Sequence, residues 1–341
     1  MSFTVKVAQF EAPLTVAMGA TILETALARD LPYPHGCRSG NCGACKSELI
    51  AGEVEMSPYS EFALTAAERD RGLILACRAV PWSDCEVAHL EADEVETHAS
   101  RDLLCRVVSA EPATHDIRIL RLAVISGGPF GFSPGQYASV TFAGQPPRDY
   151  SMASLPGADR LEFHIRLVPG GAVTPYIQDR LKVGDEVRVK GPYGTSYLRP
   201  GHGGAILALA GGSGLAPIKT IVESALESGM KQPVHLYFGV RDERDLYLND
   251  HFVDLTARHA NLTFIPVLSA PAARTARRTG FLHHAVRADF TDLDGCKAYL
   301  AGPPPMVEAA TGVLTALGIR RQDCHADAFY TEADKAAGKG V

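Results

Sequence analysis

Three cysteines lie within nine residues in the stretch "PHGCRSGNCGACK", and they constrain the fold of this part of the chain more than any other feature. Cys37, Cys42 and Cys45 have the spacing C-x4-C-x2-C, and a fourth cysteine follows at Cys77. This order is the plant-type pattern of [2Fe–2S] ligands. Four thiolates offset the charge of the irons, and loop glycines let the backbone curl closely around the sulfides. The sequence therefore predicts that these four cysteines hold a [2Fe–2S] cluster.

A structural zinc site is the alternative for the same loop. Zinc usually takes two closely spaced pairs of cysteine or histidine ligands. Here the partner of the C-x2-C pair is a lone cysteine 32 residues further on. His35 is a conceivable extra ligand, although a histidine in such a loop is more often solvated. The remaining cysteines show no ligand spacing and are expected to be core or surface thiols: Cys85, Cys105, Cys296 and Cys324.

Composition and charge limit the class of protein. The chain has 341 residues, 46% of them hydrophobic, which is enough for two or three globular domains. Its formal net charge is −6, and a mildly acidic chain is a poor candidate for binding nucleic acid. It has no run of 18 apolar residues, and its first residues, "MSFTVKVAQF", do not resemble a secretory signal. We therefore expect a cytoplasmic protein without a membrane partner.

The cysteine loop lies in a segment with the pattern of a small mixed domain, and its ββα order resembles that of the β-grasp ferredoxins. An acidic stretch at 88–100 has little apolar pattern and is expected to be a linker. The first domain is therefore predicted to span residues 1–95. Its expected elements are a hairpin over 3–10 and 12–18, a helix over 21–30 and a strand over 45–56.

The pattern changes twice after the linker. From 103 to about 200, apolar and polar residues alternate between turns rich in Gly and Pro, which is typical of an antiparallel barrel or sandwich. From about 204, apolar strands alternate with helices, which indicates an α/β domain with a largely parallel sheet. The expected fold is α+β and multi-domain, with a second domain at 96–200 and a third at 201–341. The expected strands are 114–122, 137–142, 161–168 and 185–194 in the second domain, and 234–241 and 261–269 in the third, which also has strand–turn–helix units at 205–229 and 297–318.

Two motifs in the second domain suit a cofactor that carries phosphate. Arg148, Tyr150 and Ser151 in "PPRDYSMAS" place a guanidinium, a ring and a hydroxyl at one strand edge. The guanidinium fork suits a diphosphate, and the ring can pack on a flat heteroaromatic group. Gly171 and Thr174 precede a predicted helix, whose N-terminus could bind phosphate. An unrelated polar loop and a tight turn with a threonine N-cap are the respective alternatives.

Three turns in the third domain lie where a nucleotide would bind. The glycines of 211–214 follow a strand and open a helix, although they do not match G-x-G-x-x-G. Glu243 and Asp245 follow the second strand, at the edge where α/β sheets bind ligands. An acidic residue there can take the ribose hydroxyls of NADH and would repel the extra phosphate of NADPH, whereas a solvated charged loop is the alternative. "LAGPPPM" at 300–306 faces the same crevice.

These pieces together are far more specific than any one of them. In chain order, the cysteine loop, "RDYS", "GGAVT", "AGGSGLAPI", "GVRDERDLY" and "AGPPPM" resemble the ferredoxin–NADP reductase superfamily. They are similar, more narrowly, to the three-domain reductase components of bacterial multicomponent oxygenases, of the naphthalene-dioxygenase and phenol-hydroxylase types, from Phe3 to about Asp334. The resemblance implies a β-grasp [2Fe–2S] ferredoxin, an antiparallel β-barrel that binds FAD and a parallel-sheet α/β domain that binds NADH. Such chains need no partner to fold, so we expect a monomer.

The resemblance also implies roles for individual residues. Arg148 would hold the FAD pyrophosphate, Tyr150 would lie against the isoalloxazine or ribityl chain, and Ser151 would lie near flavin N5. The residues expected around the flavin and its phosphates are His164, Ile165, Arg166, Gly171, Ala172, Val173 and Thr174. The residues expected around NADH are Gly212, Ser213 and Gly214 at the diphosphate, Asp245 or Glu243 at the adenosine ribose, Gly302, Pro303 and Met306 on the nicotinamide side, and Arg241 just beyond the second strand.

Two positions near the C-terminus bear on how closely the chain follows the family. Many members have a cysteine before the Gly-Pro-Pro, where this chain has Ala301, and its absence could slow hydride transfer. Members also keep an aromatic residue near the C-terminus that shields the flavin. "DAFYTEAD" offers Phe329 and Tyr330, and we choose Phe329 for this role. The tail after Asp334 is expected to be frayed.

The expected activity is that of an NADH-dependent flavin iron–sulfur oxidoreductase, with hydride transfer from NADH to FAD and single-electron transfer through the cluster. The acceptor is expected to be an oxygenase component, Rieske type favoured over di-iron, or a separate ferredoxin, in aromatic hydrocarbon catabolism. It would dock transiently near Arg38, Ser39 and Asn41. A reductase for a radical deoxysugar dehydratase is one alternative, and a non-catalytic zinc-binding regulatory protein is another.

Overall fold

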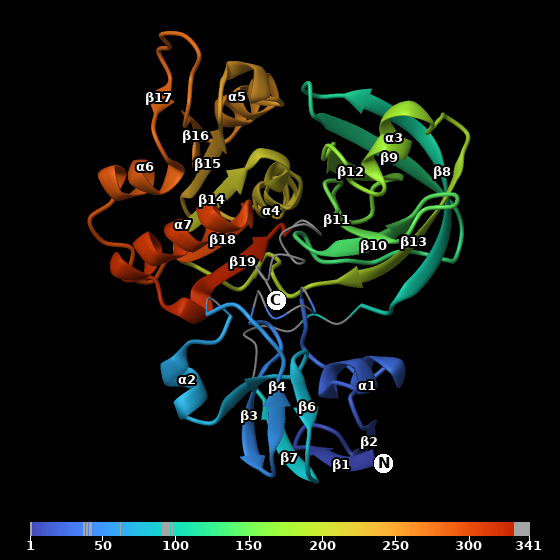
Figure 1. Ribbon diagram of the computed structural model, residues 1–341. Helices are drawn as coiled ribbons and strands as arrows, with labels where there is room; N and C mark the ends of the chain where they lie inside the picture. Colours follow the sequence, from blue (N-terminus) through green and yellow to red (C-terminus); the bar gives the residue numbers. More distant parts are fainter. Residues whose placement is uncertain are drawn as a thin grey trace. The chain divides into compact units, whose positions relative to one another are not determined.

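Three hydrophobic cores form in the computed structural model, which describes residues 2–36, 38, 40, 43–61, 63–90, 96 and 98–330 (Figure 1). The chain divides into two compact units, one made of the N-terminal segment Met1–Thr97 and the other of His98–Phe329. The first unit has one core of its own. The second unit has two cores, one inside an antiparallel sheet and the other around a parallel sheet.

The first unit is built on a five-stranded sheet in the order β2-β1-β7-β3-β5. β1 pairs antiparallel with β2 and parallel with β7. Apolar residues alternate with polar ones along β1 and β2, and the apolar side chains of this hairpin are buried in the core. The elements are β1 (Ser2–Val7), β2 (Leu14–Ala17), α1 (Ile22–Ala28), β3 (Lys46–Ala51), β4 (Val54–Met56), α2 (Ala66–Asp70), β5 (Leu73–Leu75), β6 (Ala79–Pro81) and β7 (Cys85–His89).

Both helices of this unit begin with a reciprocal cap. The Thr21 hydroxyl accepts a hydrogen bond from the backbone N–H of Glu24, and the Glu24 carboxylate accepts one from the N–H of Thr21. Thr65 and Glu68 form the same arrangement at α2. Each pair satisfies two backbone donors that a helix N-terminus leaves free. The hairpin and the helix predicted for the start of the chain are confirmed.

The single strand predicted over 45–56 is wrong. β3 ends at Ala51, and β4 begins at Val54 and pairs with β6 in a separate two-stranded sheet. Gly52 lies between them with φ +94°, and a Cβ at this position would collide with the carbonyl oxygen of Asp84. The strand must therefore break here. The predicted linker begins later than expected, because β7 extends to His89, and residues 91–95 and 97 lie outside the described part.

The second unit begins with a nearly closed antiparallel barrel in the strand order β11-β10-β13-β8-β9-β12. An isolated bridge between Met152 and Phe163 links the two edge strands. β13 alternates buried and exposed residues, as a sheet with one face on the core requires. The antiparallel fold and four predicted strands are confirmed. The elements are β8 (Arg101–Pro112), β9 (Ile117–Ser126), β10 (Tyr137–Thr141), β11 (Arg148–Ser151), β12 (Arg160–Arg166), α3 (Thr174–Asp179) and β13 (Glu186–Tyr193).

The rest of this unit is a six-stranded parallel sheet in the order β17-β16-β15-β14-β18-β19, flanked by helices (Figure 1). All six residues of β14 are buried, as expected for a central strand covered on both faces. The chain order reverses between β14 and β18, and the carboxyl ends of these strands form the edge where such sheets bind ligands. The elements are β14 (Ile206–Gly211), η1 (Gly212–Gly214), α4 (Leu215–Glu227), β15 (Val234–Val240), η2 (Glu243–Asp245), α5 (Asn249–Arg258), β16 (Leu262–Leu268), β17 (Arg278–Thr279), α6 (Leu282–Asp289), β18 (Lys297–Gly302), α7 (Pro304–Ala316), η3 (Arg321–Asp323) and β19 (Cys324–Ala328).

Candidate functional site

The cysteine loop has two of its four predicted ligands among the described residues. Cys45 and Cys77 are both buried and belong to the core of the first unit. The backbone N–H of Ala76 donates to the Cys45 carbonyl over 3.0 Å, so the two cysteine-bearing segments are hydrogen-bonded neighbours. Cys37 and Cys42 lie outside the described residues. Two soft thiol donors on hydrogen-bonded neighbouring segments fit one side of an iron–sulfur or zinc site.

Three described residues of this loop have the left-handed backbone conformation that lets a short loop close around a ligand. Arg38, Gly40 and Gly43 all have positive φ, at +55°, +79° and +75°. A Cβ on Gly40 would lie 2.9 Å from both the Tyr59 Cβ and the Arg78 Cγ, and one on Gly43 would lie 2.9 Å from a backbone oxygen. The loop therefore tolerates no larger residue at Gly40 or Gly43. It accordingly fits a ligand that the chain must closely surround.

The predicted histidine beside the loop has a partner of its own. His35 Nδ1 lies 2.8 Å from the Tyr33 carbonyl oxygen, and burial lowers the pKa of this imidazole. This hydrogen bond engages Nδ1, and a zinc ion would bind through the other ring nitrogen, Nε2. His35 therefore stays an alternative ligand through Nε2.

Strand β11 carries the R-x-Y-S motif at the edge of the barrel. Arg148 and Tyr150 share one face of the strand, and Ser151 lies on the other. Tyr150 is half-buried against the barrel core, while Arg148 is half-exposed and donates to the Pro147 carbonyl. A half-buried ring beside a reachable guanidinium suits a cofactor with a flat ring and a phosphate tail.

Ser151 reaches a residue that the sequence did not single out. Its Oγ lies 3.3 Å from Asp327 Oδ2, and the serine is almost fully buried. Asp327 lies in β19, the edge strand of the parallel sheet, 176 residues away in the chain. The hydrogen bond joins the barrel edge to the carboxyl end of the sheet. The only sequence signal for Asp327 was its place two residues before the selected aromatic Phe329.

The glycine turn before α3 is tightly closed. Gly170 has φ +71°, and the Gly171 N–H donates to the Val168 carbonyl over 3.0 Å. The Thr174 hydroxyl donates to the same carbonyl over 2.8 Å. The expected helix is present as α3, but it begins at Thr174 with Val173 as its N-cap, so the threonine is not the cap. Ala172 lies in this turn, between the glycines and the helix.

Strand β12 places its three predicted residues in different surroundings. The side chain of His164 is fully buried, with Nδ1 3.0 Å from the Tyr247 hydroxyl and Nε2 3.2 Å from Glu162 Oε1. Burial lowers the pKa of His164 despite the neighbouring carboxylate. Ile165 is buried in the barrel core, and Arg166 is half-exposed at the end of the strand. Of the three side chains, that of Arg166 is the one open to a ligand.

A buried ionic network that the sequence did not predict surrounds His164. Glu162 accepts a hydrogen bond from Arg121 Nε over 2.8 Å and lies 3.5 Å from Lys219 Nζ of α4. Lys219 also donates to Glu223 Oε2 over 3.1 Å. Burial opposes ionisation of Glu162, but the hydrogen bond from His164 and the nearby cations lower its pKa to about 2. The network ties the barrel to the helix that follows the glycine turn.

The glycine turn after β14 packs directly on the turn after β18. A Cβ on Gly214 would collide with the Ala301 carbonyl, and one on Gly211 would lie 2.9 Å from Pro303 Cδ. Gly212 has φ +54° and Gly302 has φ +145°. The structure thus brings together most of the residues predicted to face NADH. This group consists of Gly212, Ser213, Gly214, Gly302, Pro303 and Met306. Phe329 lies next to it, because its backbone N–H donates to the Gly302 carbonyl over 2.9 Å.

The acidic residues after β15 already have protein partners. Asp245 is buried and accepts two hydrogen bonds from Arg241, at 3.1 and 3.2 Å. Glu243 is exposed and accepts from Thr275 Oγ1 over 2.7 Å and from Arg277 Nε over 2.9 Å. The hydrogen bond from Thr275 and the pairing with Arg277 lower the pKa of Glu243. Glu243 is therefore the more accessible of the two for a ribose hydroxyl.

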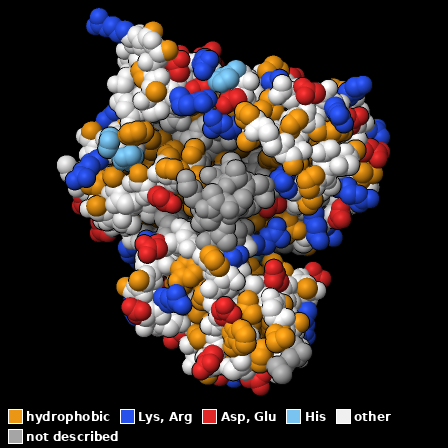
Figure 2. Space-filling model, viewed as in Figure 1, with side chains coloured by type: hydrophobic (Ala, Val, Ile, Leu, Met, Phe, Trp, Pro, Cys, Tyr) orange, Lys and Arg blue, Asp and Glu red, His pale blue; other side chains and the backbone are white. Residues whose placement is uncertain are grey.

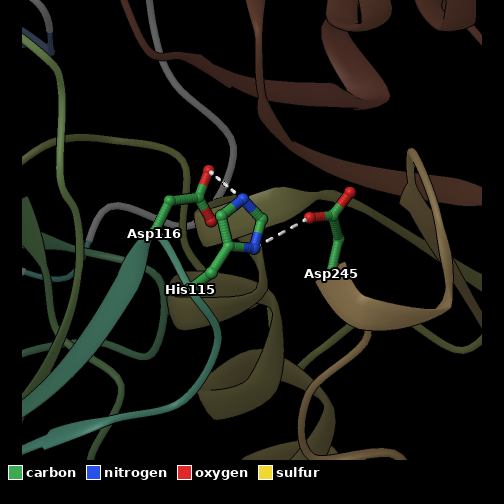
Figure 3. A group of neighbouring side chains, drawn as sticks. All are labelled: His115, Asp116 and Asp245. Carbon is green, nitrogen blue, oxygen red and sulfur yellow. Dashed lines mark ion pairs between the residues drawn. The ribbon is translucent and has the colours of Figure 1, made fainter.

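Asp245 also faces a histidine from the barrel. The His115 ring lies between two carboxylates, with Nδ1 3.5 Å from Asp245 and Nε2 3.9 Å from Asp116 (Figure 3). Asp116 in turn forms ion pairs with Arg166 and Arg241, each at 3.2 Å. These side chains come from the β8–β9 turn, the end of β12 and the loop after β15. They form a charged cluster beside the glycine turn.

The face drawn in Figure 2 has mixed charge. Figure 2 shows acidic and basic side chains interspersed over the face in view, together with scattered hydrophobic side chains. Among the described residues, no helix has both the length and the apolar composition needed to cross a membrane.

Three families match successive parts of the chain. A 2Fe-2S iron-sulfur cluster binding domain matches residues 5–81, an oxidoreductase FAD-binding domain matches 104–197, and an oxidoreductase NAD-binding domain matches 208–312. The described half of the cysteine loop, the β11 edge and the two glycine turns fall within these three matches. All three kinds of site suggested by the sequence are therefore present in one chain.

Relatives match this chain over nearly its whole length. The ferredoxin–NAD(P)+ reductase component of the naphthalene 1,2-dioxygenase/salicylate 5-hydroxylase systems from a Ralstonia species is 42% identical over 317 residues, covering 93% of this chain and 95% of that protein. The corresponding component from the Pseudomonas putida naphthalene 1,2-dioxygenase system is 41% identical over 312 residues, covering 92% and 94%. The crystal structure of an Amycolatopsis cytochrome P450 reductase matches with a TM-score of 0.78 at 34% identity, covering 96% of this chain and 98% of that chain.

Proposed function

Because this chain belongs to the family of ferredoxin–NAD(P)+ reductase components of multicomponent oxygenases, we propose that it carries electrons from NADH to an oxygenase component, or to a ferredoxin that serves one. When bound, FAD accepts hydride from NADH and the [2Fe–2S] cluster carries single electrons onward. The observation that carries the proposal is the Ser151–Asp327 hydrogen bond, since it joins the barrel edge to the nucleotide-binding edge of the parallel sheet.

Each part of the chain has a separate task in this proposal. Cys37, Cys42, Cys45 and Cys77 hold the cluster, and the glycines of the loop let the backbone close around it. On β11, Arg148 takes the FAD pyrophosphate and Tyr150 packs on the ring system. The turn before α3 adds backbone N–H groups for the same phosphates. The proposed domains remain 1–95 for the cluster, 96–200 for FAD and 201–341 for NADH.

Ser151 and Asp327 act at the point where the flavin and the nicotinamide would meet. With its proton directed to Asp327 Oδ2, the Ser151 Oγ offers lone pairs to a ring N–H. When the hydroxyl turns away from the carboxylate, it can donate to the same nitrogen. The pair therefore holds a reversible hydrogen-bonding group at the flavin edge. Phe329, next to the second glycine turn, excludes water from this position.

The turns after β14 and β18 receive the nucleotide. Gly212, Ser213 and Gly214 present backbone N–H groups to the diphosphate at the start of α4. Gly302, Pro303 and Met306 line the nicotinamide side. Ala301 has no thiol, so contact with the nicotinamide here is limited to backbone and aliphatic groups. We propose Glu243 rather than Asp245 as the group that meets the adenosine ribose, because Glu243 is exposed.

A steady-state assay tests this function. Purified holoprotein should reduce ferricyanide with NADH at a kcat/KM at least about tenfold higher than with NADPH, since a carboxylate near the ribose repels the extra phosphate. It should also reduce an isolated oxygenase component or ferredoxin, with Rieske and di-iron oxygenases tested in parallel. A protein that binds FAD but reduces no acceptor with either nucleotide would contradict the proposal.

A further inference from the structure

One carboxylate next to the glycine turn holds two arginines from different parts of the second unit. Asp116 Oδ2 lies 3.2 Å from Arg166 Nη2 and 3.2 Å from Arg241 Nη2. Arg166 ends barrel strand β12, whereas Arg241 follows β15 of the parallel sheet. The single negative charge of Asp116 therefore partly offsets the positive charges of two arginines, one from the barrel and one from the parallel sheet.

The surroundings of Asp116 hold it in this position. Its Oδ1 accepts a hydrogen bond from Thr114 Oγ1 over 3.0 Å, and its backbone carbonyl accepts one from the Leu167 N–H over 2.7 Å. Burial raises the pKa of the carboxyl, but the Thr114 hydroxyl and the positive charges of Arg166 and Arg241 outweigh it and lower the pKa. Asp116 is thus an anion near neutral pH. Arg241 is fixed independently by its two hydrogen bonds to Asp245.

The same groups form a poor site for a metal ion. His115, Asp116 and Asp245 offer three ligand atoms within 4.8 Å of one another (Figure 3). Two guanidinium groups already occupy the lone pairs of the carboxylates, and they would repel an incoming cation. The cluster is therefore suited to an anion that can replace Asp116.

Arg166 lies at the turn where the proposed function places the NADH diphosphate, and we assign it to that diphosphate rather than to the flavin phosphates. Arg166 Nη1 is 3.6 Å from the position that a Cβ on Gly212 would take, so the guanidinium lies over the turn that opens α4. The side chains of Arg166 and Arg241 are 37% and 53% exposed, whereas that of Asp116 is 20% exposed. An anion from solvent can reach both guanidinium groups. A helix N-terminus at the same turn favours negative charge independently.

We propose that Asp116 is an internal counter-ion of Arg166 and Arg241, and that the diphosphate of bound NADH displaces Asp116 from these two arginines. This inference rests on the proposed function, because that function places the diphosphate at the Gly212 turn. Asp116 competes with the nucleotide for the same donors and so weakens its binding. The reductase must release NAD+ in every cycle, and a built-in competitor favours that release.

The test measures the binding of ADP-ribose to purified holoprotein by calorimetry at low salt. Asp116→Asn should bind ADP-ribose about threefold to tenfold more tightly, since the competing charge is lost while the side-chain size is kept. The gain should shrink as KCl is raised, because salt screens these partly exposed charges. Asp102→Asn is the matched control, since Asp102 also pairs with a barrel arginine, Arg188, at 3.6 Å. Its affinity should equal that of the parent protein.

A double-mutant cycle with Arg166→Met shows whether the gain depends on the freed arginine. The gain from Asp116→Asn should fall when Arg166 is absent. The counter-ion proposal is wrong if a folded Asp116→Asn protein binds ADP-ribose no more tightly than the parent. It is also wrong if Asp116→Asn gives the same gain in affinity when Arg166 is replaced. If Asp116→Asn does not fold, Thr114→Val loosens the same carboxylate, and unchanged affinity there overturns it as well. Failure of the proposed function gives a different result, in which the parent protein neither binds ADP-ribose nor oxidises NADH.

Discussion

The cysteine loop and the Ser151–Asp327 contact are built in opposite ways. Three of the four predicted cluster ligands lie within nine residues, and the fourth follows on the adjacent segment of the same unit. Ser151 and Asp327 are 176 residues apart and meet only because barrel strand β11 and sheet strand β19 come together. The first site is a local motif, whereas the second is assembled by the fold.

This difference decides how each site responds to change. A local site depends on its own loop, so a substitution there removes one function and leaves the second unit intact. An assembled site depends on the packing of two layers, so it is sensitive to residues that no motif marks. The buried network around Glu162 and Lys219 is an example, because it joins the barrel to α4 next to the glycine turn.

Removing a predicted cluster ligand should separate the two regions most clearly. In Cys77→Ser the iron–sulfur absorption should be lost, and reduction of a protein acceptor should fall by at least about a hundredfold, because no one-electron carrier remains. NADH-dependent ferricyanide reduction should stay within about twofold of the parent, since the flavin and nucleotide sites lie in the other unit. Parallel assays with the two acceptors and an iron determination measure this. Cys85→Ala, at a buried cysteine of the same unit, is the control. Full iron content in Cys77→Ser would contradict the ligand assignment.

The assembled site should be sensitive at the residue that the sequence did not mark. Asp327→Asn should slow flavin reduction by NADH by about tenfold or more, because the Ser151 hydroxyl loses its anionic acceptor. Stopped-flow absorbance at the flavin band gives this rate directly. Asp327→Glu should recover part of it. Ser139→Ala, on the neighbouring strand β10, should leave the rate unchanged. An unaffected rate in Asp327→Asn would show that the contact is structural only.

The ionic network around Glu162, which joins the barrel to α4, should make the free energy of unfolding depend on pH. The folded-state pKa of Glu162 is about 2, below its ordinary value of 4.5, so its stabilising effect is complete above about pH 5 and is lost as the pH falls toward 2. Glu162→Gln should lower the free energy of unfolding of the second unit by about 3 kcal/mol at pH 7, because it leaves partly buried cations without their partner. Its unfolding midpoint should approach that of the parent between pH 5 and 2. A constant difference over this range would mean that Glu162 is not ionised in the network.

The smallest expected effect concerns acceptor docking at the cysteine loop. Arg38 is exposed and has a left-handed backbone conformation in the loop. Arg38→Glu should slow reduction of the physiological acceptor about threefold to tenfold and leave ferricyanide reduction unchanged, because charge at a docking surface acts on association. Arg71→Glu makes the same charge change elsewhere on this unit and is the control. Equal slowing with both acceptors would exclude docking at Arg38.

The sequence predicted the parts of the molecule whose signal is local. The ligand spacing, the R-x-Y-S motif, the change from alternating to continuous apolar strands and the helix after each glycine turn were all visible in the chain. The break at Gly52 was missed, because its cause is the close approach of the Asp84 carbonyl from another segment. Asp327, Lys219 and Asp116 were missed for the same reason. Each acquires its role from a partner on a distant element, and such pairs leave no spacing to recognise.

An anaerobic titration of purified holoprotein with NADH follows electron flow through the assembled site and the local site in one sample. We predict that absorption of both the flavin and the iron–sulfur cluster falls with NADH, and that a paramagnetic signal of a reduced [2Fe–2S] cluster appears. Cys77→Ser should show loss of the flavin absorption alone. A parent protein whose flavin is reduced while the cysteine loop holds no iron, or whose cluster stays oxidised when the flavin is fully reduced, would contradict it.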